Sequence, residues 1–271
     1  MKKVLLGLIG SGIQRSLSPA LHEEEGRHHG LRIHYQLIDV SGDVLDGLVS
    51  AARLMGFAGL NVTYPYKQAV LPLLDDLSVE ARAMGAVNTV VRDADRLIGH
   101  NTDGSGWAWG FRRALPEAKL GRVVLLGAGG AGSAIAHAAV GLGVQELLIF
   151  DRDTDRAAEL AGAVGRNAKA AKDLERAMAH ADGLIQATPL GMEKSPGMPL
   201  DAKLLRPELW VSEVVYVPLE TELLKAARRL GCATMDGGHM NVGQACRAFE
   251  LFTGEKADIA RMDAHFRRLV A

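Results

Sequence analysis

A glycine-rich segment in the middle of the chain constrains the fold more than any other feature of the sequence. It reads Gly127, Ala128, Gly129, Gly130, Ala131 and Gly132, which fits the pattern GxGxxG. The segment follows an apolar run at 123–126 and opens a small-residue stretch with helical spacing at 131–142. In such a unit the first glycine permits a tight turn, the second lets the backbone approach a pyrophosphate, and the third lets the helix pack closely on the sheet. The helix N-terminus then offers backbone N–H groups to the phosphates. We therefore expect a Rossmann-like, doubly wound dinucleotide-binding domain.

The acidic residue that ends the next apolar run bears on the choice of dinucleotide. Asp151 is placed to accept hydrogen bonds from the adenosine ribose hydroxyls, whereas a 2′-phosphate there would face this carboxylate and that of Asp153. Arg152 lies between them and leaves two alternatives open, pairing with a 2′-phosphate or stacking on the adenine. We expect NAD, with NADP the less favoured cofactor. The local alternative is that Asp151 only caps a helix beginning near Thr154, and it predicts no cofactor discrimination when Asp151 is replaced.

Length and periodicity predict two α/β domains. A chain of 271 residues exceeds the usual size of one compact core. Strand-like runs alternate with helical spacing through the first part of the chain, and a second strand–helix series follows from 123 to 215. We expect a mostly parallel sheet in the first part, with one antiparallel edge formed by a hairpin at 87–99. Two C-terminal helices, at 240–252 and 259–269, are expected to return to the first domain. The expected division is 1–103 with 240–271 for a substrate-binding and catalytic domain, and 104–239 for the dinucleotide-binding domain.

Charge and cysteine usage narrow the classes of partner. The formal net charge of -1 gives no reason to expect nucleic acid or an anionic membrane surface. The apolar run at 4–9 is too short for a signal peptide, and no stretch approaches the roughly 20 apolar residues of a membrane helix. Cys232 and Cys246 have no CxxC spacing, so we expect reduced thiols, no metal site and a cytoplasmic protein. The expected partner is a small molecule.

Polar residues stand at unusual places in the first part of the chain, within or just beyond apolar runs. They are Ser16, Ser18, Asn61, Thr63, Lys67, Asn88 and Asp103. Each has a local explanation: Ser18 and Asp103 as helix N-caps, and Lys67 as a solvated lysine of a first helical turn. Their concentration in one half of the chain favours a shared role in binding.

Eight segments, taken in order and with their spacing, resemble the motifs of a known family. They are 16–19 (Ser-Leu-Ser-Pro), 59–67 (Gly-Leu-Asn-Val-Thr-Tyr-Pro-Tyr-Lys), 85–89, 101–104, 127–132, 187–192, 215–218 and 236–244. The sequence resembles the shikimate dehydrogenases over nearly its whole length. The resemblance implies a substrate-binding domain built from both ends of the chain, a Rossmann-like domain between them, and an active site in the cleft.

The resemblance also implies roles for individual residues. Lys67 and Asp103 would be the catalytic pair, and Ser16 and Ser18 would hold the substrate carboxylate. The residues implied to bind substrate are Ser16, Ser18, Thr63, Lys67, Asn88, Asp103, Tyr216 and Gln244. Those implied to bind the dinucleotide are Gly127, Ala128, Gly129, Gly130, Ala131, Gly132, Asp151, Arg152, Thr188, Val214, Gly237 and Met240. Thr188, Val214, Gly237 and Met240 would line its nicotinamide end together with Tyr216.

The implied activity is that of an oxidoreductase of aromatic amino acid biosynthesis, in the chorismate pathway, interconverting shikimate and 3-dehydroshikimate by hydride transfer. NADP-using members typically read Asn-Arg-Thr at the cofactor strand, and Asp151-Arg152-Asp153 resembles the NAD-using branch. NAD-using members that accept quinate well often have threonine at position 18, so Ser18 favours shikimate.

One alternative is a dehydrogenase of quinate or of an amino-substituted shikimate or quinate. An alternative of another class is a non-catalytic, dinucleotide-binding redox sensor, which would have no chemical need for Lys67 and Asp103 together. A monomer or a homodimer is expected.

The chemistry of alcohol oxidation singles out Lys67. A secondary alcohol gives up a hydride and a proton, so the site needs a proton-accepting group within about 3 Å of the reacting oxygen. His22, His100 and His239 are interpreted as structural or surface residues, which leaves Lys67 as the best candidate. In the carbonyl-reducing direction we expect Lys67 to act as a positioned ammonium acid, with Asp103 orienting it.

Overall fold

A computed structural model describes residues 1–270, and the chain divides into two compact units. One unit comprises Met1–Thr102 with Gln244–Ala271, and the other comprises Asp103–Gly243. The boundaries fall at 102/103 and 243/244, close to the expected 103/104 and 239/240. Both units are α/β, and the predicted fold class is confirmed by the two six-stranded sheets that the chain forms.

The second unit contains a fully parallel sheet in the strand order β12-β11-β10-β7-β8-β9. Its elements are α4 (Asp103–Ala114), β7 (Arg122–Leu126), α5 (Gly130–Leu142), β8 (Glu146–Phe150), α6 (Thr154–Val164), β9 (Ala168–Ala170), α7 (Leu174–Ala179), β10 (Gly183–Gln186), a 3₁₀ turn (Ala202–Leu204), β11 (Trp210–Glu213), α8 (Glu222–Leu230), β12 (Ala233–Met235) and the first turns of α9 (Gly237–Thr253). From β7 the chain continues to β8 and β9 on one side of the sheet, and from β10 it continues to β11 and β12 on the other side. The carboxyl ends of these two strands therefore form the topological switch point at which doubly wound sheets bind ligands.

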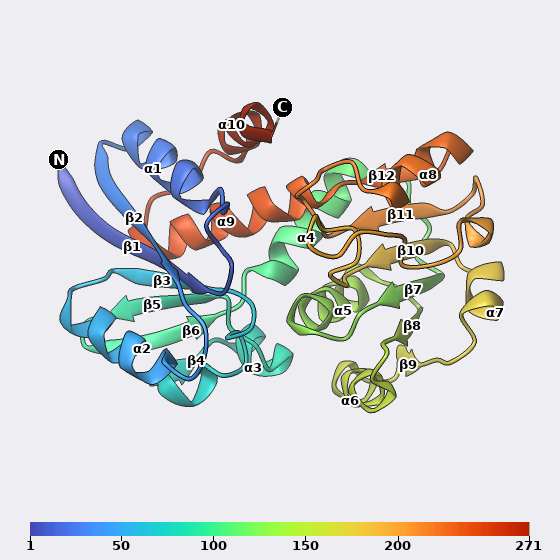
Figure 1. Cartoon of the computed structure of the whole chain (residues 1–271), viewed down its shortest axis with the longest axis horizontal. Coiled ribbons are helices and arrows are strands. Elements are labelled where there is room, and N and C mark those ends of the chain that lie inside the picture. Colours follow the sequence, from blue (N-terminus) through green and yellow to red (C-terminus); the bar gives the residue numbers. More distant parts are fainter. Residues whose placement is uncertain (271) are drawn as a thin grey trace. The chain divides into compact units, whose positions relative to one another are not determined.

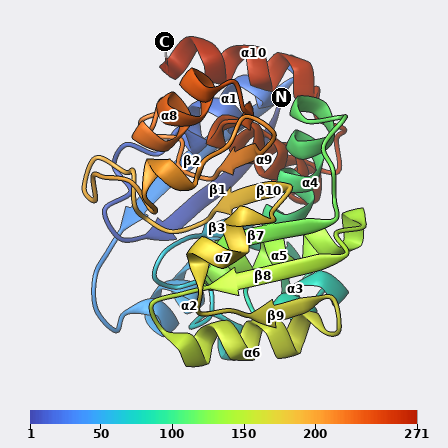
Figure 2. The same cartoon turned by 90° about the vertical axis from the view of Figure 1, so that its right-hand side faces the viewer.

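Helices cover both faces of this sheet, which explains why successive residues in the middle of its central strands β7 and β8 are apolar. Val123 and Leu125 point to the core that contains α4, α5 and α6, whereas Val124 and Leu126 point to the core that contains α7 and α8. Figure 2 shows α7 on the near face of the sheet and α5 on the far face. Two-faced burial removes the polar alternation of a half-exposed strand, as is typical of parallel α/β sheets.

The first unit contains a mixed sheet in the order β2-β1-β3-β5-β6-β4 (Figure 1). Its elements are β1 (Lys2–Gly10), α1 (Ser18–His28), β2 (Leu31–Asp39), α2 (Leu45–Leu54), β3 (Gly59–Val62), a 3₁₀ turn (Leu71–Leu73), β4 (Asp76–Leu77), α3 (Val79–Met84), β5 (Thr89–Asp93), β6 (Arg96–His100), the later turns of α9, and α10 (Ile259–Val270). Strands β2, β1 and β3 are parallel, and β5 is antiparallel to both β3 and β6. The predicted hairpin is present, but the prediction that it forms the edge was wrong, because the short strand β4 pairs parallel to β6 beyond it.

The C-terminal helices contribute to the core of the first unit. Phe249 and Phe252 of α9 pack with Leu6 of β1 and Ile33 of β2. The Glu25 carboxylate of α1 is 1% exposed; it accepts hydrogen bonds from the Arg261 guanidinium of α10 at 2.6 and 2.9 Å, which ties the last helix to the first. A buried carboxylate held by a bidentate arginine is costly to break, because removing either partner leaves an uncompensated charge.

Candidate active site

The glycine-rich turn after β7 has the close contacts that its pattern predicts. Gly127 has φ +100°, and a Cβ there would lie 2.8 Å from the carbonyl oxygen of Ala187. A Cβ on Gly132 would lie 2.0 Å from the carbonyl oxygen of Gly127, so only glycine lets α5 start so close to the turn. A Cβ on Gly129 would meet nothing within 4 Å, which leaves that stretch of backbone open to a ligand. Gly127 and Gly132 therefore permit the close contacts of the turn, and Gly129 leaves the backbone accessible at the N-terminus of α5.

Asp151 at the end of β8 is tied to this turn. Its carboxylate accepts a hydrogen bond from the backbone N–H of Ala128 at 2.7 Å and another from that of Asp153 at 3.0 Å. Asp153, not Asp151, caps α6, since its side chain accepts from the N–H groups of Asp155 and Arg156. The alternative in which Asp151 is merely a helix cap is therefore wrong. Arg152 is exposed beside it.

The loop after β10 is organised by a buried amide. Gln186 is 0% exposed, and its Nε2 donates to Thr188 Oγ1 and to the carbonyl oxygen of Leu190, both at 2.8 Å. Its Oε1 accepts from the backbone N–H of Thr188 at 3.1 Å. Thr188 is thereby held at the switch point, where its methyl group would lie 3.1 Å from a Cβ on Gly127.

The segment after β11 meets the start of α9 in the same unit. A Cβ on Gly237 would lie 2.4 Å from the carbonyl oxygens of both Val214 and Val215, so glycine lets the helix begin against this backbone. Met240 is buried in the core against which Val214 packs. Tyr216 is half-buried, and burial raises the pKa of its phenol. The structure thus brings Val214 and Gly237 together after β11, as it brings Gly127, Asp151 and Thr188 together after β7, β8 and β10.

In the first unit the two predicted serines are neighbours. The Ser16 hydroxyl donates to Ser18 Oγ at 3.2 Å, and Ser16 Oγ accepts from the Ser18 backbone N–H at 3.3 Å. Helix α1 begins at Ser18 with Leu17 as its N-cap and with no side-chain cap. The local explanation of Ser18 as an N-cap is therefore wrong, and another reason for the hydroxyl pair is needed.

Asn88 lies at the centre of a buried polar network. It is 4% exposed; its Nδ2 donates to Thr102 Oγ1 at 3.0 Å, and its Oδ1 accepts from the Thr102 backbone N–H at 2.8 Å. The preceding Val87 donates its N–H to the carbonyl oxygen of Lys67 at 2.8 Å, which links the Lys67 backbone to this strand. Thr63 is anchored by a backbone hydrogen bond to Ile9 at the end of β1.

Asp103 and Gln244 stand at the boundaries between the units. Asp103 follows Thr102 directly, is 5% exposed and begins α4. Gln244 is half-buried in α9. Lys67 belongs to a turn of the first unit and is partly buried, so the solvated helical lysine of the local alternative is not observed. The pairing of Lys67 with Asp103 stays a prediction.

Comparison with known proteins identifies the family. Residues 8–90 match the model of the shikimate dehydrogenase substrate binding domain, and residues 111–191 match that of shikimate / quinate 5-dehydrogenase. A shikimate dehydrogenase (NADP(+)) of Streptomyces avermitilis is 55% identical, over 98% of this chain and 95% of that protein. A quinate/shikimate dehydrogenase (NAD(+)) of Corynebacterium glutamicum is 51% identical, over 98% of this chain and 99% of that protein. The chain belongs to the shikimate dehydrogenase family.

A solved structure agrees with this assignment. The quinate dehydrogenase of Corynebacterium glutamicum in complex with NAD superimposes with a TM-score of 0.93 at 49% identity, covering 99% of this chain and all of that one (100%). As a member of the shikimate dehydrogenase family, the chain is an oxidoreductase. Its relatives are named for NAD or for NADP, so a nicotinamide dinucleotide is common to them while the choice between the two differs.

The glycine turn also meets the steric requirement for such a dinucleotide. The open Gly129 backbone and the start of α5 lie at the switch point, where a pyrophosphate needs N–H donors. The Asp151 carboxylate, bonded to the Ala128 N–H, lies after the neighbouring strand β8, where a ribose needs an acceptor. Within residues 1–270 no group of three or more His, Cys, Asp or Glu side chains could hold a metal ion. No helix of that part of the chain is long and apolar enough to cross a membrane.

Three buried polar residues that had no individual predicted role support the candidate site: Asn61, Gln186 and Glu213. Asn61 is 6% exposed and joins the Tyr35 hydroxyl, at 2.7 Å, to Thr89 Oγ1, at 3.0 Å. The signal was a polar residue inside or at the end of an otherwise apolar strand, because an unpaired polar group is costly to bury. Asn61 shows this signal within β3, and Gln186 and Glu213 show it at the ends of β10 and β11.

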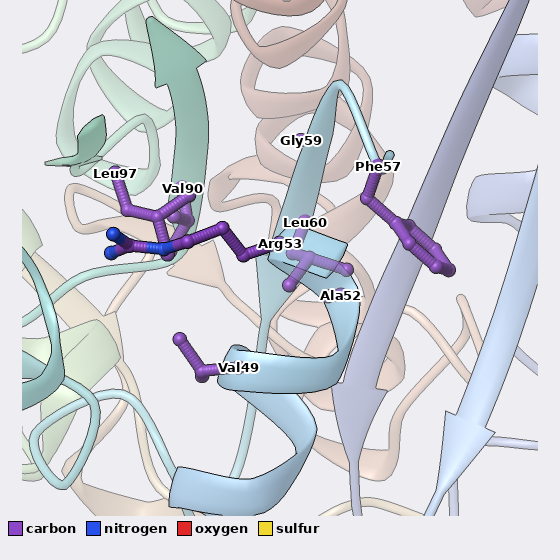
Figure 3. A pocket seen from close by; sticks show the side chains of 8 residues that line it. All are labelled: Val49, Ala52, Arg53, Phe57, Gly59, Leu60, Val90 and Leu97. Atoms are coloured by element: carbon purple, nitrogen blue, oxygen red, sulfur yellow. The ribbon is translucent and has the colours of Figure 1, made fainter. Parts of the chain in front are cut away.

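A small, partly open pocket of the first unit is lined by none of these residues. It holds about 10 Å³ under α2 and is lined by apolar side chains and the stem of Arg53, including Phe57, Leu60 and Leu97 (Figure 3). Such a volume accommodates about one water molecule and no substrate.

Proposed function

We propose that this protein catalyses the NAD-dependent interconversion of shikimate and 3-dehydroshikimate. The observation that carries the proposal is membership of the shikimate dehydrogenase family over almost the whole chain, at 55% identity to a shikimate dehydrogenase and 51% to a quinate/shikimate dehydrogenase. The substrate class is a small polyhydroxylated carboxylic acid. Cytoplasmic location and a monomeric or homodimeric state belong to the same proposal.

In the first unit, the hydroxyl pair of Ser16 and Ser18 would bind the substrate carboxylate. Both hydroxyls lie within 3.2 Å of each other, which suits donation to two oxygens of one carboxylate. Thr63 and Asn88, with Gln244 of α9, would bind ring hydroxyls. The buried network around Asn88 supports this role because it fixes the orientation of the amide before substrate arrives.

Lys67 and Asp103 would be the catalytic pair. A nicotinamide dinucleotide held by the second unit would supply the hydride-transfer chemistry at the carbinol carbon of the substrate. Lys67 Nζ would take the hydroxyl proton in the oxidative direction and return it to the carbonyl oxygen in the other. Asp103 would hold both the Lys67 ammonium group and a substrate hydroxyl, since a carboxylate can accept several hydrogen bonds at once.

In the second unit, residues 127–132 would cradle the pyrophosphate and Asp151 would accept from the adenosine ribose. Thr188, Val214, Gly237 and Met240 would line the nicotinamide end, with Tyr216 beside the substrate. NAD is the proposed cofactor because a 2′-phosphate would face the Asp151 carboxylate, whose oxygens already order the turn. Arg152 is exposed and free of the turn's hydrogen bonds; it would stack on the adenine.

The deciding experiment is a two-by-two assay of cofactor reduction, with shikimate or quinate against NAD or NADP. The proposal expects the highest kcat/KM for shikimate with NAD. A higher value with quinate would favour the quinate dehydrogenase, and a higher value with NADP would overturn the role given to Asp151. Absence of turnover in all four combinations would leave two alternatives: a dehydrogenase of an amino-substituted substrate, or the non-catalytic redox sensor.

A further inference from the structure

A buried carboxylate ends strand β11 immediately before the segment assigned to the nicotinamide end. Glu213 is 0% exposed. One of its oxygens, Oε1, accepts from the backbone N–H groups of Val214 at 2.9 Å and Val215 at 3.0 Å. The other, Oε2, accepts from the Thr221 hydroxyl at 2.9 Å. These hydrogen bonds to Glu213 therefore all come from the loop that follows β11.

These contacts close the loop 214–221 on itself. Thr221 caps α8, because its Oγ1 also accepts from the backbone N–H of Leu224 at 3.3 Å. The Val214 N–H is shared between Glu213 Oε1 and the carbonyl oxygen of Gln186, the latter at 3.1 Å. The Glu213 side chain thus joins the two ends of the loop, and the Val214 backbone N–H connects the loop to the end of β10.

The same backbone is confined from its other side by the start of α9. A Cβ on Gly237 would lie 2.4 Å from the carbonyl oxygens of Val214 and Val215. Their N–H groups point to Glu213, while their carbonyl groups face Gly237. The position of this peptide segment is therefore determined on both sides.

Burial of the Glu213 carboxylate at the end of β11 costs free energy. Desolvation raises the pKa of Glu213 to about 7, against the opposing effect of its hydrogen bonds from Val215, Thr221 and Val214. The preceding buried positions of β11 include Trp210 and Val211, and an apolar residue at 213 would avoid this cost. The carboxylate must therefore contribute something that an apolar side chain cannot, and the fixed geometry of the loop is that contribution.

We propose that Glu213 is a positioning residue for the nicotinamide half of the dinucleotide. It holds the 214–215 backbone at the geometry required beside the ring, without touching the ring itself. Gln186 does the same for the neighbouring loop through Thr188 and Leu190. The inference rests on the proposed function, in which Val214 and Tyr216 line that end of the cofactor.

The test compares the binding of NAD with that of ADP-ribose, which carries the adenosine and pyrophosphate but no nicotinamide ring. Dissociation constants are measured calorimetrically for the full-length wild type, E213A and E213Q. E213A is expected to weaken NAD about tenfold, as for the loss of one hydrogen-bonded anchor, while ADP-ribose stays within about twofold. E213Q keeps one acceptor oxygen for the N–H groups and is expected to lie between wild type and E213A.

The matched control is E222A, which removes an exposed glutamate from the first turn of α8. The Glu222 carboxylate accepts a hydrogen bond from Lys225 Nζ at 2.9 Å on the surface of α8. Both ligands should therefore bind E222A as they bind wild type. A purely structural role of Glu213 would lower the melting temperature without separating the two ligands. Should E213A fail to fold, E213Q carries the same comparison.

The outcomes separate the two proposals. The positioning role alone is overturned if the wild type binds NAD and the variants lose affinity for NAD and ADP-ribose equally, or lose affinity for neither. Wild type that binds neither ligand overturns the proposed function and the positioning role with it. Selective loss of NAD in E213A, with partial rescue in E213Q, is the expected result.

Discussion

The backbone N–H of Ala128 donates a 2.7 Å hydrogen bond to the carboxylate of Asp151, which joins the glycine-rich turn after β7 to the end of β8. One carboxylate therefore orders the turn that would receive the pyrophosphate and stands where the adenosine ribose would lie. A substitution at this position should change both the geometry of the turn and the choice between NAD and NADP.

Replacing Asp151 by alanine is expected to raise the KM for NAD by about 10- to 100-fold. Hydrogen bonds to a charged acceptor contribute about 1.5 to 3 kcal/mol, and the same change removes the charge that opposes a 2′-phosphate. The ratio of kcat/KM for NADP to that for NAD should therefore rise. The control is D153A, which removes the cap of α6 at a cost of about 1 kcal/mol in stability but should leave the KM for NAD unchanged. An unchanged KM in D151A would remove Asp151 from the cofactor site.

Replacing Lys67 by alanine is expected to lower kcat by about 10²- to 10⁴-fold, with a much smaller change in the KM for shikimate. Positioned proton transfer contributes a factor of that order. The adjacent and exposed Gln68 supplies a control, Q68A, which should retain wild-type rates. A kcat in K67A equal to that of wild type would exclude Lys67 from the chemistry.

Alanine substitution is expected to have different effects at two glycines of α5, the N-cap residue Gly129 and the internal Gly141. A Cβ on Gly129 meets no protein atom, so G129A should fold normally but raise the KM for NAD at least about tenfold, because the methyl group would occupy the pyrophosphate's approach. A Cβ on Gly141, inside α5, also meets nothing, and G141A should stabilise the protein by about 0.5 to 1 kcal/mol with unchanged kinetics. Denaturant unfolding and steady-state kinetics on both variants test the pair. Equal KM values would argue against pyrophosphate binding at Gly129.

The buried His22 is expected to make the fold sensitive to acid. It is fully buried and stacked on Tyr35 at 5.0 Å between ring centroids, and desolvation lowers its pKa from 6.5 to about 3 despite the nearby Glu25. The unfolded chain therefore binds a proton that the folded chain does not, and stability is lost as the pH falls from about 6.5 towards 3. The loss attributable to this group is on the order of 5 kcal/mol. H22F should show a smaller decline in the free energy of unfolding over this range, and a decline equal to that of wild type would contradict the assignment.

Glu213 should act on stability with the opposite sign. Its pKa is raised from 4.5 to about 7 by burial, so the folded chain holds a proton that the unfolded chain has released between these values. Its contribution is therefore fully present below about pH 4.5 and declines as the pH rises to about 7, by roughly 3 kcal/mol. The difference in unfolding free energy between wild type and E213Q, measured at intervals from pH 4.5 to 8, should show this decline. A difference that is constant across the range would contradict it.

Local pattern predicted the central strands of the second unit and the helices after β7 and β8, but not helices α7 and α8. The apolar runs of β7, β8, β10 and β11, the glycine turn and the helix after it all follow from residue types that are close together in the chain. Their runs of consecutive apolar residues reflect burial on both faces of a parallel sheet, and that signal is strong. The short strands β4, β9 and β12 escaped prediction because two or three residues carry too little periodicity to be distinguished from a loop.

The sequence by itself determined the α/β class, the glycine turn and, through its motifs, the family and the list of candidate site residues. Only the tertiary structure decided how those residues are supported. Strand register places Gln186 beside Glu213, although they are far apart in the chain, and turns both side chains into loop anchors. It likewise joins Tyr35, Asn61 and Asn88 into one buried network. The physical reason is that a hydrogen-bond partner across a sheet is set by register and packing between distant segments, which no local pattern of residue types specifies.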